Sequence, residues 1–199
     1  MKGCSMGVVE LKKLKRSRLY SEELGINLST KEESEVFKWF LASVLFGATI
    51  SEKVAKNTYK TFEKYGILTP QEILDAGWDA LVNVLDEGGY VRYDFSTADK
   101  LLSICRTLLE KYGCLTKLHE KAENPRDLEE KLLEFKGVGP VTVNIFLREL
   151  RPFWEKADPK VLPRVEKRAQ QLGVKLEEYG RKSLTFTRLE AGLIRGRRE

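Results

Sequence analysis

A pair of glycines, Gly137 and Gly139, lies in the segment best suited to chemistry on a polyanion. Both belong to the string Phe135–Pro140, which follows an amphipathic run and ends on a proline that can open a helix. Glycine lets a backbone turn sharply and approach a phosphate without an intervening side chain, and the free N–H groups at a helix N-terminus favour negative charge. Residues 128–148 therefore predict two helices joined by a hairpin that binds phosphates.

The binding surface expected of this hairpin is made by its glycines and their neighbours. Contacts of this kind recognise the phosphate backbone and not the edges of bases, so binding would be independent of nucleotide sequence. The residues assigned to it are Lys136, Gly137, Val138, Gly139, Val141 and Thr142. An ordinary glycine turn between two helices is the alternative interpretation.

The second group capable of chemistry is a carboxylate. Asp158 follows Gly139 by 19 residues and precedes Pro159, a pairing typical of a helix N-cap. A carboxylate at a helix start could also stabilise a cation-like sugar while a glycosidic bond breaks. Capping and catalysis are compatible with each other at this position. Lys160 and Arg164, which follow, are candidates for additional phosphate contacts.

The histidine and cysteine content excludes several other mechanisms. His119 is the single histidine, which leaves histidine triads and multi-histidine metal centres without their parts. Cys4, Cys105 and Cys114 are scattered and lack the close pairing of a zinc or iron–sulfur site. We expect reduced thiols, no metal and no cofactor, so any catalysis rests on carboxylates or lysines.

The hairpin string and Asp158 together resemble the helix-hairpin-helix of the DNA glycosylase superfamily, which includes endonuclease III, the adenine glycosylase MutY and the alkylated-base glycosylases. Residues 37–56 resemble the first core helix of that family, and residues 96–109 its helix before the hairpin. The resemblance implies that Asp158 is the catalytic aspartate. It also implies that the partner is double-stranded DNA containing a damaged base.

Val141 departs from part of the family. Bifunctional members similar to endonuclease III have a nucleophilic lysine at this position, two residues after the second hairpin glycine, and a valine cannot supply an amine. Many relatives also hold an iron–sulfur cluster with four C-terminal cysteines, and no cysteine follows Cys114. The resemblance then implies a monofunctional DNA N-glycosylase. The alternatives are a non-catalytic DNA-binding module and a bifunctional glycosylase/lyase that uses another lysine.

The loop at residues 86–94 is a candidate for probing a duplex. Its paired glycines permit unusual backbone angles, and aromatic and guanidinium planes stack on nucleobases. Tyr90, Arg92 and Tyr93 are therefore assigned as a duplex wedge or stacking group. A plain surface turn is the alternative.

Helix signals occur along the whole chain. Ser29, Thr69, Ser96 and Asn124 each occupy a position typical of an N-cap, and the first two have the spacing of a capping box. Only the stretch 184–186 alternates in the manner of a short strand. The sequence therefore predicts an all-α fold.

By the resemblance, the all-α chain should form the two-lobed helical DNA glycosylase fold with one cleft. One lobe would comprise residues 40–145 and end in the hairpin, and the other would combine residues 1–39 with residues 146–199. A net charge of +5 favours a polyanionic partner, and no apolar run approaches the roughly 20 residues of a membrane span. We expect a monomer that is not bound to membranes and is cytoplasmic, associated with the nucleoid in a prokaryote.

Overall fold

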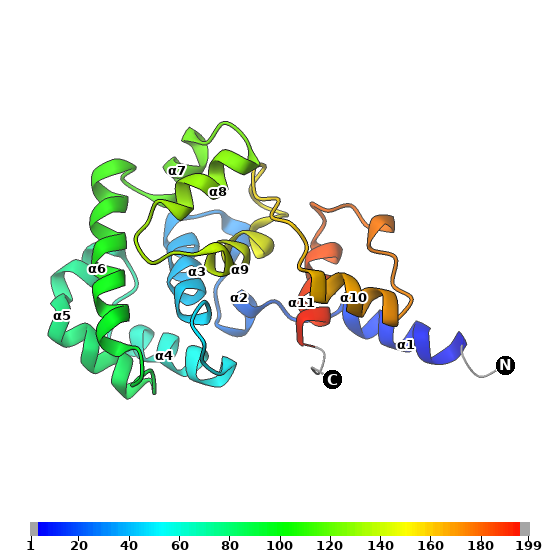
Figure 1. Ribbon diagram of the computed structural model, residues 1–199, viewed down its shortest axis with the longest axis horizontal. Coiled ribbons are helices and arrows are strands. Elements are labelled where there is room, and N and C mark those ends of the chain that lie inside the picture. The colour runs from blue at the N-terminus through cyan, green and yellow to red at the C-terminus, as the bar shows by residue number, and fades with distance from the viewer. Residues whose placement is uncertain (1–3, 196–199) are drawn as a thin grey trace.

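The computed structural model describes residues 4–195, with side chains from residue 10 onward. Within this range the chain forms helices and loops and no strand, so the all-α prediction is confirmed there (Figure 1). In chain order the α-helices are α1 (Cys4–Lys15), α2 (Tyr20–Glu23), α3 (Glu33–Phe46), α4 (Glu52–Lys64), α5 (Pro70–Glu87), α6 (Asp94–Lys111), α7 (Leu115–Lys121), α8 (Pro125–Leu133), α9 (Pro140–Leu150), α10 (Pro163–Gln171) and α11 (Leu184–Arg195). Short 3₁₀ turns are η1 (Leu28–Thr30) and η2 (Leu176–Glu178).

Two of the predicted helix caps are confirmed. Before α5, the Thr69 hydroxyl accepts the N–H of Glu72, while the Glu72 carboxylate accepts the N–H of Thr69. Before α8, the Asn124 side chain accepts the N–H of Asp127. Each bond satisfies an amide that the helix itself leaves without an acceptor. Both sites combine the cap with a proline at the first helical position, and this double signal identified them.

The other two predicted caps are wrong. Ser29 lies in η1 and donates its hydroxyl proton to Asn27, and α3 begins only at Glu33. Ser96 lies inside α6, which begins at Asp94. The stretch 184–186, whose alternation is typical of a short strand, opens α11 instead. Short polar side chains bond to the backbone in turns and in the first helical turn as well as at N-caps, so a serine alone does not locate the helix start.

The larger of two apolar cores surrounds α3. Residues 36–45 of this helix are almost all buried, because apolar side chains occupy every face of it. Trp39 donates its indole N–H to the carbonyl of Phe146 on α9 at 3.0 Å, which satisfies the polar atom of a fully buried ring. Phe40 packs edge-on against both Phe146 and Phe135. The segment predicted to bind phosphates is therefore anchored on the core through α9 and Phe135.

A smaller core joins the two ends of the chain. Its buried residues are Leu14, Val165, Ala169, Val174, Leu189 and Leu193. They come from α1, α10, α11 and the loop after α10, and the three helices lie side by side in Figure 1. The division between the cores differs from the predicted lobe boundaries, because Tyr20–Phe37 and Trp154 pack in the larger core. The smaller core therefore includes only part of the lobe that was predicted from segments 1–39 and 146–199.

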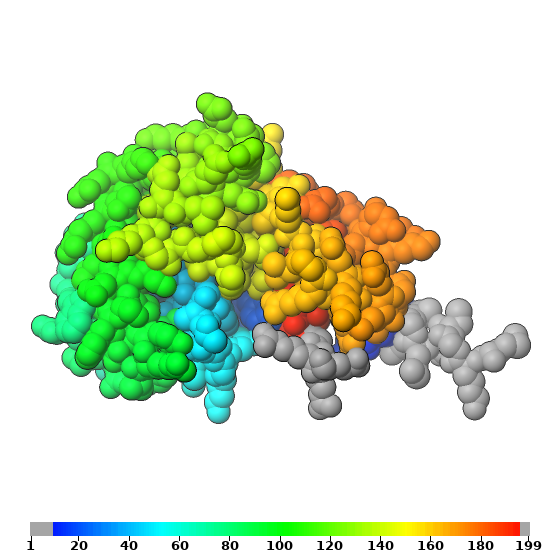
Figure 2. All heavy atoms as spheres, in the orientation of Figure 1, coloured from blue at the N-terminus to red at the C-terminus, as the bar shows by residue number. Residues whose placement is uncertain are grey.

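The surface is hollowed where the two cores meet. Figure 2 shows this recess between the cyan segment that joins α3 to α4 and the orange α10. No helix within residues 4–195 combines the length and the apolar character needed to cross a bilayer.

Gly88 sets the close approach of α4 to the end of α5. A Cβ placed on Gly88 would lie 2.5 Å from the Cα of Thr58, and a backbone atom cannot move aside as a flexible side chain would. The C-terminal end of α5 therefore packs directly against the backbone of α4, immediately before the loop at 86–94.

We predict that Gly88→Ala lowers the free energy of unfolding by about 1–3 kcal/mol, because one added methyl overpacks this contact. Urea denaturation followed by tryptophan fluorescence would measure the change. Gly180→Ala is the matched control, since no atom lies within 4 Å of the added Cβ there. Equal denaturation midpoints for the two variants would contradict the packing argument.

Candidate functional site

The predicted hairpin joins α8 to α9 through a tight turn. Gly137 has a φ of 83°, a left-handed conformation that glycine adopts without steric cost. Val138 then returns the chain, with its N–H bonded to the carbonyl of Phe135 at 2.9 Å. Gly139 is the extended N-cap residue of α9. The local structure predicted for residues 128–148 is therefore confirmed, while phosphate binding stays a prediction.

Several amides of this turn are free to bind an external acceptor. Among the described residues, no acceptor is bonded to the N–H groups of Gly137, Gly139, Val141 or Thr142. No atom lies within 4 Å of the position that a Cβ would take on Gly139, so the backbone is open there. Amides at a helix start that lack protein acceptors are suited to an anion.

The side chains assigned to the hairpin surface divide into exposed and buried groups. Lys136 and Val141 are exposed, Val141 by 62%. Val138 and Thr142 are buried, so only their backbones can meet a ligand. The Thr142 hydroxyl lies 2.1 Å from where a Cβ of Gly47 would be, so this contact brings the start of α9 close to the end of α3. Thr142 therefore holds the hairpin in place through packing.

Lys100 is a neighbour of the hairpin that the sequence did not indicate. A Cβ on Gly137 would lie 2.8 Å from Lys100 Cε, so the lysine side chain crosses the turn. Burial lowers the pKa of Lys100. Lys136 and Lys100 come from segments far apart in the chain, and only the fold brings their positive charges to one turn.

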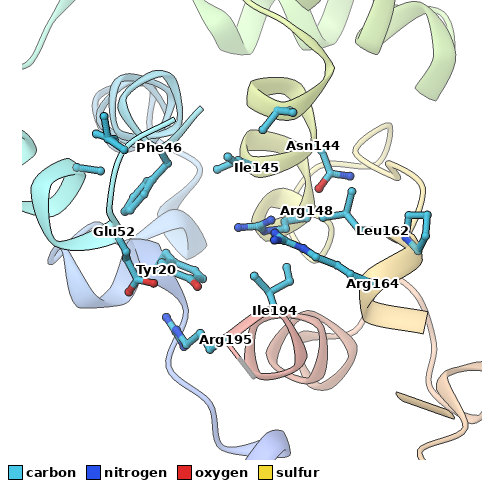
Figure 3. Close-up of a pocket in the computed structure, with 14 residues that line it drawn as sticks. Tyr20, Phe46, Glu52, Asn144, Ile145, Arg148, Leu162, Arg164, Ile194 and Arg195 are labelled. Atoms are coloured by element: carbon cyan, nitrogen blue, oxygen red, sulfur yellow. The ribbon is translucent and has the colours of Figure 1, made fainter. Parts of the chain in front are cut away.

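A cavity of 730 Å³ lies beside α9, between the two cores (Figure 3). One wall comes from α2, α3 and α4, and the other from α9, the segment before α10, and α11. Aromatic Tyr20 and Phe46 face Arg148 and Arg164 across the space, and Glu52 is the carboxylate among its described lining residues. The cavity thus combines aromatic surface with a few charged groups, as ligand sites commonly do.

The aromatic wall is arranged by two close contacts. Tyr20 and Phe46 meet edge to face, with ring centroids 5.6 Å apart, and the Arg195 guanidinium lies 3.9 Å from the centre of the Tyr20 ring. Burial raises the pKa of Tyr20, and the charge of Glu52 acts in the same direction. The Tyr20 hydroxyl is therefore neutral at physiological pH and can donate a hydrogen bond.

Asp158 does not occupy the predicted position at a helix start. Leu162 is the N-cap of α10, and Asp158 lies in the extended segment before it. Its carboxylate is bound instead by two guanidinium groups, Arg151 at 2.5 Å and Arg181 at 2.8 Å. Arg151 also donates to the carbonyl of Pro159, which holds the segment extended. Asp158 is not among the residues that line the cavity.

Arg151 is the centre of a buried ionic network between the cores. Its side chain has no exposed surface, and it pairs with Glu190 of α11 at 3.2 Å as well as with Asp158. Glu190 is itself only 1% exposed. Arg151 directly follows α9, Asp158 lies in the segment before α10, and Glu190 belongs to α11. The network therefore fixes the second core against the first.

Of the three side chains on the loop at 86–94 that were predicted to probe a duplex, Arg92 and Tyr93 are not buried and Tyr90 is. The prediction for Tyr90 is wrong, because its ring is 1% exposed and its hydroxyl donates to the carbonyl of Leu45. Burial raises the pKa of Tyr90. Arg92 is exposed and stacks over the ring of Tyr93, 5.5 Å from its centre. The neighbouring Phe95, 58% exposed, was not identified from the sequence.

The two basic residues after Asp158 differ in their surroundings. Lys160 is exposed, and its backbone carbonyl accepts a hydrogen bond from Asn144 at 3.0 Å. Arg164 reaches the cavity, where Figure 3 shows it extending toward Arg148. Arg164 is therefore the one of the two that the structure brings to the cavity.

The described cysteines and the histidine lie in surroundings that indicate a role in packing. Cys105 is free and buried, and burial raises the pKa of its thiol to about 12. Cys114 is also free, and the side chain of Cys4 lies outside the described residues. His119 stacks on Trp154, with ring centroids 4.4 Å apart. Within the described part of the chain, no three His, Cys, Asp or Glu side chains are grouped to hold a metal ion.

Comparison with known proteins identifies no relative. No family model, no curated protein and no solved structure matches the chain.

We predict that Glu190→Gln lowers the free energy of unfolding by about 3–5 kcal/mol, because it leaves the buried Arg151 without its buried partner. Guanidinium denaturation would measure the loss. Glu178→Gln is the control, since Glu178 is 59% exposed in its pair with Lys175 and such pairs contribute less than about 1 kcal/mol. A similar small effect from both variants would show that the network does not hold the cores together.

Proposed function

We propose that the protein is a monofunctional DNA glycosylase that removes a damaged base from double-stranded DNA. One observation carries this proposal: a single helix, α9, contributes both the open amides of the hairpin and one wall of the cavity. Gly139 caps this helix, and Asn144 and Arg148 line the cavity farther along it. At 1.5 Å per residue, they lie roughly 7 and 14 Å along the axis from the cap. A nucleotide whose phosphate binds the hairpin would therefore reach the cavity when it leaves the stack.

The cavity suits a base taken out of a duplex. Its 730 Å³ lies within the usual size of ligand sites, and Tyr20 and Phe46 offer aromatic surface against which a base can pack. Enzymes that act on a base extrude it, and a damaged or mispaired base costs least to extrude. Arg92 and Tyr93, on the loop at 86–94, are the proposed groups for filling the duplex.

The proposed reaction is hydrolysis of the N-glycosidic bond. The bond between the base and C1′ breaks, the base leaves with the bonding electrons and takes a proton, and water adds to C1′ to give an abasic site. Positive charge develops on the sugar, so a nearby carboxylate lowers the barrier. Val141 cannot form an imine with C1′, and the proposed enzyme therefore leaves the strand intact.

Two carboxylates compete for the role of stabilising the sugar. We assign it to Asp158 on the family resemblance. Asp158 must then release Arg181, the more exposed of its two arginine partners, in order to face the sugar. Glu52 is the alternative because of its position, since it lines the cavity from the first turn of α4. Its carboxylate is bound by Lys56 at 2.5 Å.

We predict that the wild-type protein releases a free base from at least one duplex in a panel of deaminated, oxidised and alkylated lesions. Asp158→Asn should slow release roughly 100- to 1,000-fold, and Glu52→Gln should change it little. Single-turnover assays with chromatography of the released base would measure this, and borohydride should trap no covalent adduct.

The controls for this assay are the affinity for DNA and the melting temperature of each variant, which separate chemistry from folding. A loss confined to Glu52→Gln would move the catalytic role to the cavity carboxylate. DNA binding without release from any duplex would contradict the proposed enzyme and favour a non-catalytic binding module.

We predict that Lys136→Met weakens binding to every duplex by a similar factor and reduces the slope of log K against log salt by about one, because a phosphate contact releases one counterion. Anisotropy titrations at several salt concentrations would measure both. Lys64→Met, a change of an exposed lysine at the end of α4, is the control. An unchanged slope for Lys136→Met would place the bound phosphates away from the hairpin.

A further inference from the structure

Arg148 is a buried cation that forms no ion pair with a described residue, although its guanidinium lies over the Tyr20 ring, 5.6 Å from the ring centre. It is 5% exposed and lines the cavity, its Nε has no acceptor among the described residues, and no carboxylate of those residues forms an ion pair with it. Burial lowers the pKa of Arg148; the charges of Glu149 and Glu190 oppose this effect, and the charge of Arg164 adds to it. An arginine nevertheless keeps its charge in proteins. A guanidinium in these surroundings destabilises the free protein unless a ligand supplies acceptors.

Asn144, one helical turn before Arg148, has a hydrogen-bond acceptor that is not in use among the described residues. Its side-chain N–H₂ donates to the carbonyl of Lys160, which fixes the orientation of the amide. Its Oδ1 is buried and accepts no hydrogen bond from a described residue. Residues four apart on a helix lie on the same face, with Cβ atoms about 5–6 Å apart. The cavity wall therefore presents an unused acceptor beside an unused set of donors.

We propose that Asn144 and Arg148 together recognise an oxo base, through an N–H group that faces Asn144 and a carbonyl oxygen that faces Arg148. Uracil, hypoxanthine and 8-oxoguanine have such an edge. The inference rests on the proposed function, and it narrows the substrate of the same cavity to oxidised or deaminated bases.

The positive charge of the cavity excludes bases that are themselves cations. Arg148 and Arg164 approach one another in this space, and Glu52, which carries the opposite charge, is already bound by Lys56. Purine nucleotides alkylated at N7, such as 7-methylguanine, are cations, and this alkylation also removes an acceptor that an arginine could use. Like charges in a buried site repel strongly. Thymine and guanine in normal pairs share the oxo edge, but the cost of extrusion protects them.

The test measures affinity with duplexes that cannot be cleaved. Each carries one central 2′-fluoro nucleotide with uracil, hypoxanthine, 8-oxoguanine or 7-methylguanine as the base, and a further duplex carries an abasic analogue. Fluorescence anisotropy should show binding to the oxo-base duplexes at least about 10-fold tighter than to the 7-methylguanine duplex. Arg148→Met should weaken binding to the oxo-base duplexes roughly 10- to 100-fold and leave the abasic duplex unaffected, because a good bidentate contact has this value.

The free protein provides a second measurement. Arg148→Met should raise the melting temperature by roughly 2–4 °C, because an apolar side chain replaces an unpaired buried charge. A structural arginine would instead lower it on removal. Arg126→Met is the matched control, since Arg126 is 88% exposed at the start of α8 and should change neither selectivity nor stability.

Three results would overturn the inference: equal or tighter binding to 7-methylguanine, unchanged selectivity in Arg148→Met, or no binding to any of the duplexes. Selective binding to oxo bases with no base release from natural-sugar duplexes would contradict the proposed catalysis while supporting the recognition. The two proposals therefore fail on different measurements.

Discussion

The buried ion pair between Arg151 and Glu190 is the interaction on which the arrangement of the whole molecule depends. The smaller core, made from both ends of the chain, has few buried residues of its own, and it is fixed against α9 by this pair and by the extended segment around Asp158. Residues from both sides of that junction line the cavity. Breaking a buried pair leaves an uncompensated charge, so the junction is strongly specified.

Helix α9 connects this buried ion pair to the hairpin and the cavity. Its first turn follows the hairpin and carries two of the open amides, its middle lines the cavity, and Arg151 follows its last residue. Thr142 against Gly47 and Trp39 against the carbonyl of Phe146 fix the same helix to the larger core. A rigid element that carries both a phosphate-binding turn and a pocket wall would place a nucleotide without further adjustment, and the proposed function uses this property.

Local signals in the sequence predicted the local structure. The glycine hairpin and the caps at Thr69 and Asn124 were identified because neighbouring residues determine them. Asp158, which also precedes a proline, is not a cap, because Leu162 is the N-cap of α10. The positions of Asp158 and Tyr90 were not predictable, since a distant arginine binds the first and the larger core encloses the second. Arg148 was not identified either. A lone arginine within an apolar helix is informative only when the fold shows that its guanidinium is buried beside a cavity and forms no ion pair with a described residue.

The most direct test of the account is the location of an extruded base. A duplex with 5-iodouracil at the lesion position, irradiated in complex with the protein, forms adducts with aromatic side chains in contact with the base. We predict that mass spectrometry will find the adduct on Tyr20 or Phe46, the two aromatic rings among the described residues that line the cavity. Adducts found only on residues outside the cavity would contradict it.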